Sequence, residues 1–159
     1  MRLLKDLHLY PTIGFNEIKF YDSYDYVRSL IGDPYCIMRS QEDSSFYKGV
    51  FNDGNLILSF HREMHHLTRI QYNLNHNSMT RLYLDTDAIS PYIYNVLEWV
   101  ILHDQDTVKL GEESYHSDKL HMDLFHVSNH IRHLSLIELF PLREYTTGPY
   151  RVTSKLQLN

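Results

Sequence analysis

Histidines grouped within six residues are the first side chains in this sequence that could do chemistry. The segment 61–66 is His-Arg-Glu-Met-His-His. Its first and fifth positions are four residues apart, which on a helix lets two imidazoles bind one zinc ion. The metalloprotease motif needs a glutamate directly after the first histidine, and Arg62 stands there instead. Because the flanks, 55–60 and 67–72, resemble strands, we expect a hairpin here, with metal binding as the alternative.

Three further histidines, His116, His121 and His126, recur every five residues, with Asp118 and Asp123 between them. A spacing of five matches neither the period of a helix nor that of a strand. We therefore expect that these side chains do not all share a face in regular structure. A metal site gathered in a loop is the alternative, and histidines at this density could make partner binding sensitive to mild acid.

The single cysteine, Cys36, is the one candidate thiol nucleophile. It follows the segment 32–35, Gly-Asp-Pro-Tyr, and precedes two apolar residues, so we expect a buried structural thiol. One cysteine cannot form an intramolecular disulfide, and it fits a reducing compartment.

Other catalytic patterns are missing from the sequence. No serine stands in a nucleophile-elbow motif, six glycines leave little room for a phosphate-binding loop, and acidic residues between 85 and 123 are too frequent to single out a catalytic pair. The sequence therefore predicts a protein that is not an enzyme and uses no cofactor. A small histidine-dependent, metal-binding hydrolase is the alternative.

Short helices and strands must position these residues, and the first half of the chain marks them clearly. Residues 17–20 alternate as in a strand, Ser23 is a suitable N-cap, and Gly32 can end the helix that follows in a left-handed conformation. Three strands are predicted next, at 46–50, 55–61 and 67–73, with the turn signal Asn-Asp-Gly-Asn between the first two.

The second half has the same order with longer connections. A strand at 81–84 precedes a helix with Ser90 as its cap and Pro91 in its first position. The apolar stripe of this helix consists of Ile93, Val96, Leu97, Val100 and Ile101. Strands are predicted at 108–110, 122–127 and 131–140 around a polar loop at 111–119, and an edge strand is predicted at 150–153.

Similar segments in the two halves point to an internal duplication. The segment 20–23 resembles 83–86, Phe60-His61 resembles Phe125-His126, and 66–72 resembles 133–139, at offsets of 63, 65 and 67 residues. We predict an α+β fold in which two similar helix-plus-antiparallel-strand units form one sheet with the helices packed on one face. The chain 1–159 would be a single domain, with repeats at 13–75 and 79–140 and a C-terminal strand or tail at 141–159. The alternative is that amphipathic elements merely look alike.

The composition is that of a globular protein of 159 residues, with 43% hydrophobic and 22% charged residues. No run of about 18 apolar residues could span a membrane. The first residues lack the apolar core of a secretory signal, so we expect a cytoplasmic protein. The chain contains thirteen tyrosines and eleven histidines. Tyrosine is favoured at protein interfaces, although it also suits strand faces.

The net charge of −5 is unevenly distributed along the chain. Between Asp85 and Asp123 nine acidic residues face two lysines, which gives −7 in this window and leaves +2 for the rest. Such a charge disfavours nucleic acid and favours a basic protein partner. A solvated face that keeps the protein soluble is the alternative.

The segment 14–23, followed by Val27, the Leu-Ile-Gly at 30–32 and Pro34, resembles the opening of the β-lactamase-inhibitor-protein-like fold. That resemblance implies a helical segment packed on an antiparallel sheet, in tandem units whose concave sheet grips a protein target through aromatic and acidic residues. The chain departs from the inhibitor in having no cysteine pair for a disulfide and no secretion signal.

In its size, acidity and tyrosine content, the chain also resembles small bacterial toxin-immunity proteins, including those of contact-dependent growth inhibition and other polymorphic toxin systems. This resemblance implies a cognate toxin domain, often a basic nuclease, that is held through a surface of opposite charge. Tyrosines would supply the anchors.

Together these features predict an immunity protein that neutralises one toxin by occluding its active cleft. Its partner-binding residues are expected between elements of the acidic window, where exposure is easiest: Asp104, Asp106, Glu112, Glu113, Tyr115 and Asp118. No nucleic acid, membrane, metal or cofactor enters this prediction.

Overall fold

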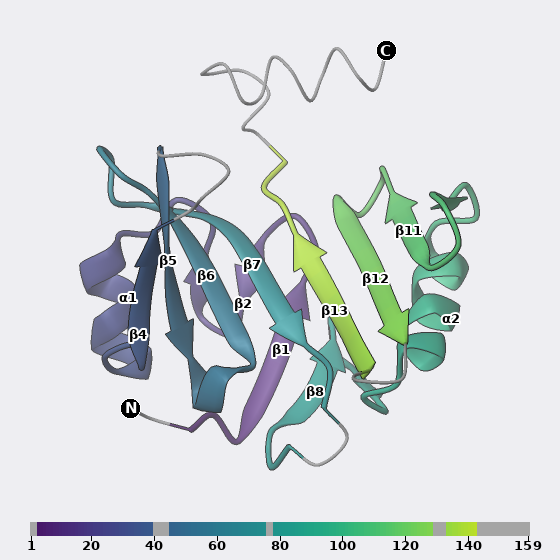
Figure 1. Cartoon of the computed structure of the whole chain (residues 1–159), viewed down its shortest axis with the longest axis horizontal. Helices are drawn as coiled ribbons and strands as arrows, with labels where there is room; N and C mark the ends of the chain where they lie inside the picture. The colour runs from purple at the N-terminus through teal and green to yellow at the C-terminus, as the bar shows by residue number, and fades with distance from the viewer. Residues whose placement is uncertain (1–2, 40–44, 76–77, 129–132, 143–159) are drawn as a thin grey trace.

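The strands of this computed structural model form two sheets (Figure 1). The structure describes residues 3–39, 45–75, 78–128 and 133–142. The small sheet has the order β3-β2-β1-β8-β9, with β1 (Asp6–Tyr10) and β8 (Arg81–Leu84) paired in parallel at its centre. Its outer strands are β2 (Gly14–Phe15), β3 (Ile18–Lys19) and β9 (Asp87–Ile89).

The large sheet is antiparallel throughout and has the order β10-β11-β12-β13-β7-β6-β5-β4. Its first-half strands are β4 (Cys36–Arg39), β5 (Phe46–Phe51), β6 (Leu56–His61) and β7 (Leu67–Asn73), with the short 3-10 helix η1 (Asn52–Gly54) between β5 and β6. Its second-half strands are β10 (Val108–Lys109), β11 (Ser114–Ser117), β12 (Met122–Ser128) and β13 (His133–Leu139). Strands of this sheet contribute to both candidate binding sites described below.

The helix α1 (Tyr24–Ile31) begins and ends as the sequence predicts. The Ser23 hydroxyl accepts a hydrogen bond from the Tyr26 backbone amide at 3.1 Å, which satisfies a donor of the first turn. Gly32 ends the helix with a φ of 86°, a conformation that glycine adopts without a steric penalty.

The helix α2 (Ile93–His103) starts later than the sequence predicts. Its N-cap is Tyr92, whose side chain makes no capping hydrogen bond, so Ser90 and Pro91 belong to the preceding turn. The buried face of α2 also differs from the apolar stripe that the sequence predicts. Ile93, Val96, Trp99 and Val100 are buried, whereas Ile101 is exposed. The side chain of Trp99 replaces that of Ile101 in the core and donates its indole N–H to Asp87 at 2.8 Å.

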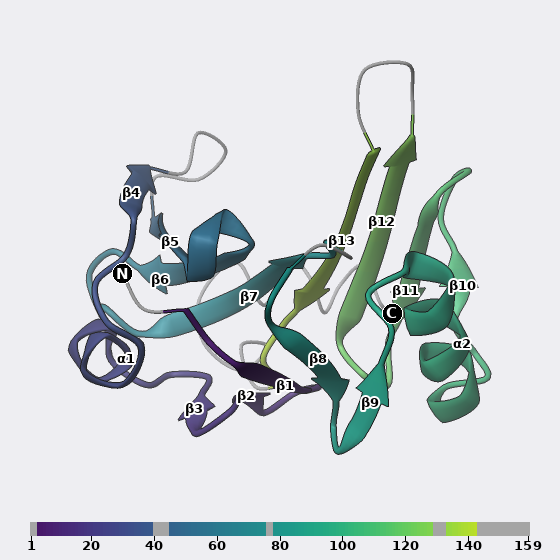
Figure 2. The same ribbon diagram turned by 90° about the horizontal axis from the view of Figure 1, so that it is seen from below.

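The helices and the small sheet lie on the same side of the large sheet. Figure 2 shows α1, then the small sheet, then α2 following one another along it. Buried apolar side chains from both sheets and both helices form one cluster between these layers. The prediction of an α+β fold is confirmed, but the prediction of one sheet is wrong, because β1 and β8 pair with each other beneath the large sheet instead of joining it.

The central pair of strands in the large sheet has a reciprocal register. Ile70 lies opposite Leu139, and Tyr72 lies opposite Ile137. At the sequence offset of 67 residues, Ile70 corresponds to Ile137 and Tyr72 to Leu139. Ile70 therefore pairs with the counterpart of Tyr72, and Tyr72 pairs with the counterpart of Ile70, as expected for two strands related by a twofold axis. The strand order is mirrored on the two sides of this pair.

Other sequence similarities do not follow this register. Phe60 is buried, and β12 presents its buried side chains at Met122 and Leu124, which places Phe125 on the opposite face of its strand. The segment 20–23 is a turn before α1, whereas 83–86 ends β8 and turns into β9. The parallel pairing of β1 with β8 also departs from the twofold relation.

Five strands of the described residues were missed by the sequence patterns: β1, β2, β4, β9 and β11. β11 falls inside the predicted polar loop, where tertiary pairing of Ser114 through Ser117 with β12 outweighs their weak strand propensity. The predicted strand at 150–153 lies outside the described residues. No helix among the described segments is long and apolar enough to cross a membrane.

Candidate functional site

Most of the acidic window of the sequence lies at one end of the molecule. Figure 2 shows α2, β10 and β11 together at this end, with β9 beside β8 in the small sheet. The strand β10 is the terminal strand of the large sheet and pairs with β11. Folding therefore concentrates at this end a charge that the sequence spreads over 39 residues, from Asp85 to Asp123.

Asp104 is the predicted contact residue that the structure places inside. It is 6% exposed and follows the last turn of α2. One carboxylate oxygen accepts the Ser117 hydroxyl at 2.6 Å, and the other accepts the Asp106 backbone amide at 3.0 Å. These hydrogen bonds, the Ser117 bond foremost, lower the pKa of Asp104. These hydrogen bonds link the end of α2 to β11, and they occupy both carboxylate oxygens, so we do not expect Asp104 to contact a partner.

The other four acidic residues are exposed and border the β10–β11 hairpin. Asp106 precedes β10 and Asp118 follows β11, so both lie at the open end of the hairpin. Glu112 and Glu113 lie at its turn, the opposite end. The structure therefore distributes these carboxylates along one edge of the molecule.

Tyr115 lies between these acidic groups in the sequence, and its side chain is half-buried. It stands opposite Leu124 in the sheet and packs against the hydrophobic core. Its ring supports β11 and is not an exposed anchor.

Exposed apolar side chains accompany the four acids, and sequence patterns did not identify them as a surface. Leu102 and Ile101 at the end of α2 are 72% and 45% exposed, and Val108 and Leu110 in and after β10 are 51% and 54% exposed. We call these eight residues the acidic edge: Ile101, Leu102, Asp106, Val108, Leu110, Glu112, Glu113 and Asp118. Exposed apolar residues next to charges are typical of a binding surface.

A paired histidine lies beside the acidic edge. His116 of β11 stands opposite Asp123 of β12, and its Nδ1 lies 2.5 Å from the Asp123 carboxylate. The hydrogen bond to Asp123 raises the pKa of His116, with a smaller contribution from Asp118, whose carboxylate is 3.9 Å from the other ring nitrogen.

The histidine segment 61–66 connects β6 to β7 in an antiparallel hairpin, as the sequence predicts. The rings of His61 and His66 are 5.7 Å apart, and the Tyr47 hydroxyl is 3.1 Å from His65 Nδ1. Burial, with a contribution from His61, lowers the pKa of His66. Within the described segments, no group of three histidine, cysteine, aspartate or glutamate residues is placed to hold a metal ion.

Cys36 is exposed, so the prediction of a buried thiol is wrong. It opens β4, the other terminal strand of the large sheet, and all four residues of that strand are exposed. The apolar neighbours that suggested burial belong to a sheet edge that no described element covers.

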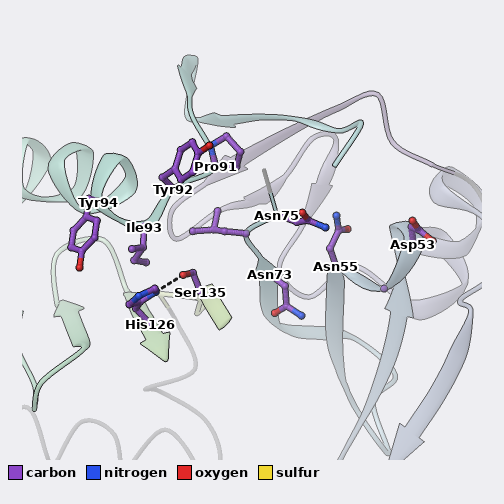
Figure 3. Close-up of a pocket in the computed structure, with 12 residues that line it drawn as sticks. Asp53, Asn55, Asn73, Asn75, Pro91, Tyr92, Ile93, Tyr94, His126 and Ser135 are labelled. Atoms are coloured by element: carbon purple, nitrogen blue, oxygen red, sulfur yellow. Dashed lines mark hydrogen bonds between the residues drawn. The ribbon is translucent and has the colours of Figure 1, made fainter. Parts of the chain in front are cut away.

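A groove of about 700 Å³ opens on the helix side of the large sheet, next to the first turn of α2. Figure 3 shows Tyr94, Ile93, His126 and Ser135 at one end, Asp53 and Asn55 at the other, and Asn73 and Asn75 between them. No local sequence pattern indicates this groove, because its walls come from separate parts of the chain: η1, the end of β7, the start of α2 with the residues before it, β12 and β13.

His126 and Ser135 are the closest polar pair in the groove. They stand opposite each other on β12 and β13, with His126 Nδ1 2.6 Å from the Ser135 hydroxyl. His116 points to the other face of the sheet, because its partner Asp123 is an odd number of residues from His126. The expectation that His116, His121 and His126 do not share one face is therefore confirmed for the first and third.

Comparison with known proteins adds no relative: no protein-family model, no curated protein and no solved structure matches the chain.

Proposed function

We propose that this chain is a protein-binding immunity protein that neutralises a cognate bacterial toxin in the cytoplasm by covering its active cleft. The observation that carries the proposal is the acidic edge, in which four exposed carboxylates and four exposed apolar side chains lie on the β10–β11 hairpin, the segments next to it and the end of α2. The chain itself performs no chemistry in this mechanism.

The apolar residues would supply most of the affinity. Leu102 and Leu110 are more than half exposed, and burial of a leucine side chain contributes about 1.5–3 kcal/mol. A polar rim around such a centre excludes water and fixes the orientation of the partner. The acidic edge has this composition, with its charges at both ends of the β10–β11 hairpin.

The charges indicate a basic partner. The four carboxylates lie at the end of the molecule where the sequence window carries −7. A field of this sign accelerates encounter with a positively charged domain and disfavours nucleic acid itself. A basic nuclease-type toxin domain has the required charge, because such a domain must bind a polyanion.

Reversal of three carboxylates tests this surface. We expect the triple variant Glu112→Lys, Glu113→Lys, Asp118→Lys to bind the partner about tenfold more weakly or worse at low salt, since exposed charge pairs contribute up to about 1 kcal/mol each. The partner is first captured from a lysate of the source bacterium, and its affinity is then measured by calorimetry at several salt concentrations.

A matched control carries the same change of charge on another surface. The variant Glu17→Lys, Asp25→Lys, Glu63→Lys also changes the net charge by +6, from −5 to +1, at exposed positions outside the acidic edge. Equal losses in the two triple variants would show a general charge effect, and unchanged affinity in the first variant would reject the acidic edge as the binding surface.

We also propose that the large sheet arose by tandem duplication of a helix followed by four strands. The mirrored strand order and the reciprocal register of β7 with β13 support this proposal. A duplication of this kind produces a wide sheet whose two terminal strands, β4 and β10, are free to diverge in charge and shape.

A further inference from the structure

We propose that the groove beside α2 binds an extended, basic segment of the partner protein. This inference rests on the proposed function, because it assigns a second contact to the same partner. It adds a specific chemistry: an arginine or lysine side chain at the ends of the groove, near Asp53 or near Tyr92 and Tyr94.

The groove has the size and shape for a segment of chain. Its volume of about 700 Å³ lies within the range of sites that bind small molecules or short peptides. Figure 3 shows its lining residues drawn out from Tyr94 at one end to Asp53 at the other. An elongated groove fits an extended strand better than a compact ligand.

The charges around the groove favour a cation. Asp53 is the one acidic residue in the lining, and neither lysine nor arginine is among the described residues that line it. The Glu113 carbonyl accepts the His126 backbone amide at 2.9 Å, which places the acidic turn of the β10–β11 hairpin next to the groove. His126, which lines the groove, is the titratable group that would oppose a cation when protonated.

Two tyrosines at the α2 end suit a basic side chain as well. Tyr92 and Tyr94 are 52% and 68% exposed, and the Tyr94 ring centre is 6.2 Å from that of His126. A guanidinium group stacks on a tyrosine face through a cation–π interaction. Exposed rings at the mouth of a groove are available for this contact.

The middle of the groove is lined by asparagines. Asn73 stands opposite Leu136 in the sheet, next to the buried Tyr72, so its side chain lies on the face away from Ser135. There its Oδ1 accepts a hydrogen bond from the Gln71 side chain at 3.4 Å. The Asn55 side chain has another role: it donates to the Ser78 hydroxyl and accepts from Asn52, which fixes the floor of the groove.

A short peptide tests the groove without the partner. The full chain is titrated with acetyl-Gly-Arg-Gly-Gly-amide and with the same peptide carrying citrulline, an uncharged analogue of arginine, and amide shifts are followed by NMR. We expect the shifts to centre on Gly54, Tyr94 and His126, and we expect the citrulline peptide to bind about threefold more weakly.

Two variants distinguish the contribution of the Asp53 charge to peptide binding from that of the Tyr94 ring. Asp53→Asn should remove the preference for arginine over citrulline, and asparagine tolerates the left-handed φ of 59° at this position. Tyr94→Ala should weaken both peptides about threefold, with greater loss for arginine. Glu17→Gln, an exposed acid away from the groove, serves as the control and should leave both affinities unchanged.

The outcomes distinguish this inference from the proposed function. Equal binding of the two peptides, or shifts outside the groove, would overturn the groove assignment, while a partner that responds to reversal of the acidic edge would still support the proposed function. If the groove bound the arginine peptide as expected but no protein partner were captured from the lysate, the preference of the groove for a basic segment would be supported and the toxin-neutralising function would be rejected.

Discussion

Asp104 and Asp106 show how two acidic residues in one loop acquire different roles. Both follow α2, but the backbone directs the Asp104 carboxylate toward Ser117 and leaves the Asp106 side chain exposed. A buried carboxylate with two hydrogen bonds stabilises the fold, whereas an exposed one is free to contact a partner. Sequence spacing alone could not separate them, because both appear as acids after a helix.

Substitution of these two residues should reveal the difference. We expect Asp104→Asn to lower the free energy of unfolding by about 2 kcal/mol near neutral pH, because it removes a charged acceptor of two hydrogen bonds. The pKa of Asp104 is lowered in the folded state, so its contribution is present above the unfolded pKa and is lost as the pH falls through the folded one. Urea denaturation measures both effects.

The matched variant is Asp106→Asn in the same loop. Because the Asp106 side chain is exposed, its stability should stay within about 0.5 kcal/mol of the wild type. Similar losses in the two variants would contradict the structural role assigned to Asp104.

The pair of His116 and Asp123 predicts a pH dependence of stability. The folded-state pKa of His116 is raised, first by its hydrogen bond to Asp123. The stabilisation is therefore complete below the unfolded histidine pKa of about 6.5 and is lost as the pH rises through the folded value.

We expect Asp123→Asn to destabilise the protein more at about pH 5 than at about pH 8.5, and to shift the NMR titration of His116 to lower pH. A loss of stability that is equal at both pH values would contradict a charged histidine in this pair.

At the scale of the elements, the β2–β3 hairpin depends on one glycine. Gly14 has a φ of 155°, and a Cβ placed there would lie 2.0 Å from the Ile18 carbonyl oxygen. Gly54 in η1 also has a positive φ, 88°, but a Cβ there would meet no atom within 4 Å. A side chain at position 14 would therefore clash with neighbouring backbone atoms, whereas at position 54 only the backbone conformation disfavours a side chain.

Gly14→Ala should destabilise the protein by about 3 kcal/mol or more, because the backbone of the hairpin must move as well as adopt a strained conformation. Gly54→Ala should cost only about 1–2 kcal/mol, the penalty for the left-handed conformation. Thermal and urea unfolding measure both. Equal costs would show that the hairpin has room for a side chain at position 14.

For the whole molecule, stability should be highest at the centre of the large sheet. The strands β6, β7, β12 and β13 carry buried side chains such as Leu58, Ile70, Leu124 and Ile137, whereas β4 and β10 are exposed terminal strands. Opening of the central strands requires loss of the shared core, but the terminal strands can separate alone.

Hydrogen exchange measured by mass spectrometry tests this ranking. Amides of β7 and β13 should exchange most slowly, and amides of β4 and β10 most rapidly, with β5 and β11 between them. If β10 exchanged as slowly as β13, the acidic edge would be a rigid part of the core and not a separately opening terminal strand.

The local elements that the sequence predicts correctly are those with strong short-range signals. The cap at Ser23, the stop at Gly32 and the strands of the first meander depend on residues close in the chain, so pattern and turn chemistry were sufficient. The strands β4 and β11 have exposed or polar side chains, and their partners lie elsewhere in the sheet. Their pairing is a tertiary property that local periodicity does not contain.

By itself, the sequence determined that the chain forms a mixed α+β fold, where its first helix begins and ends, and which window carries the acidic charge. The tertiary structure decided that the strands divide into two sheets, that Asp104 is buried and Tyr115 packs half-buried against the core, and that Cys36 lies on an exposed terminal strand. It also brought five separate segments together around the groove. The physical reason is range: capping, turns and periodicity act within a few residues, whereas burial and strand pairing depend on contacts between residues far apart in the chain.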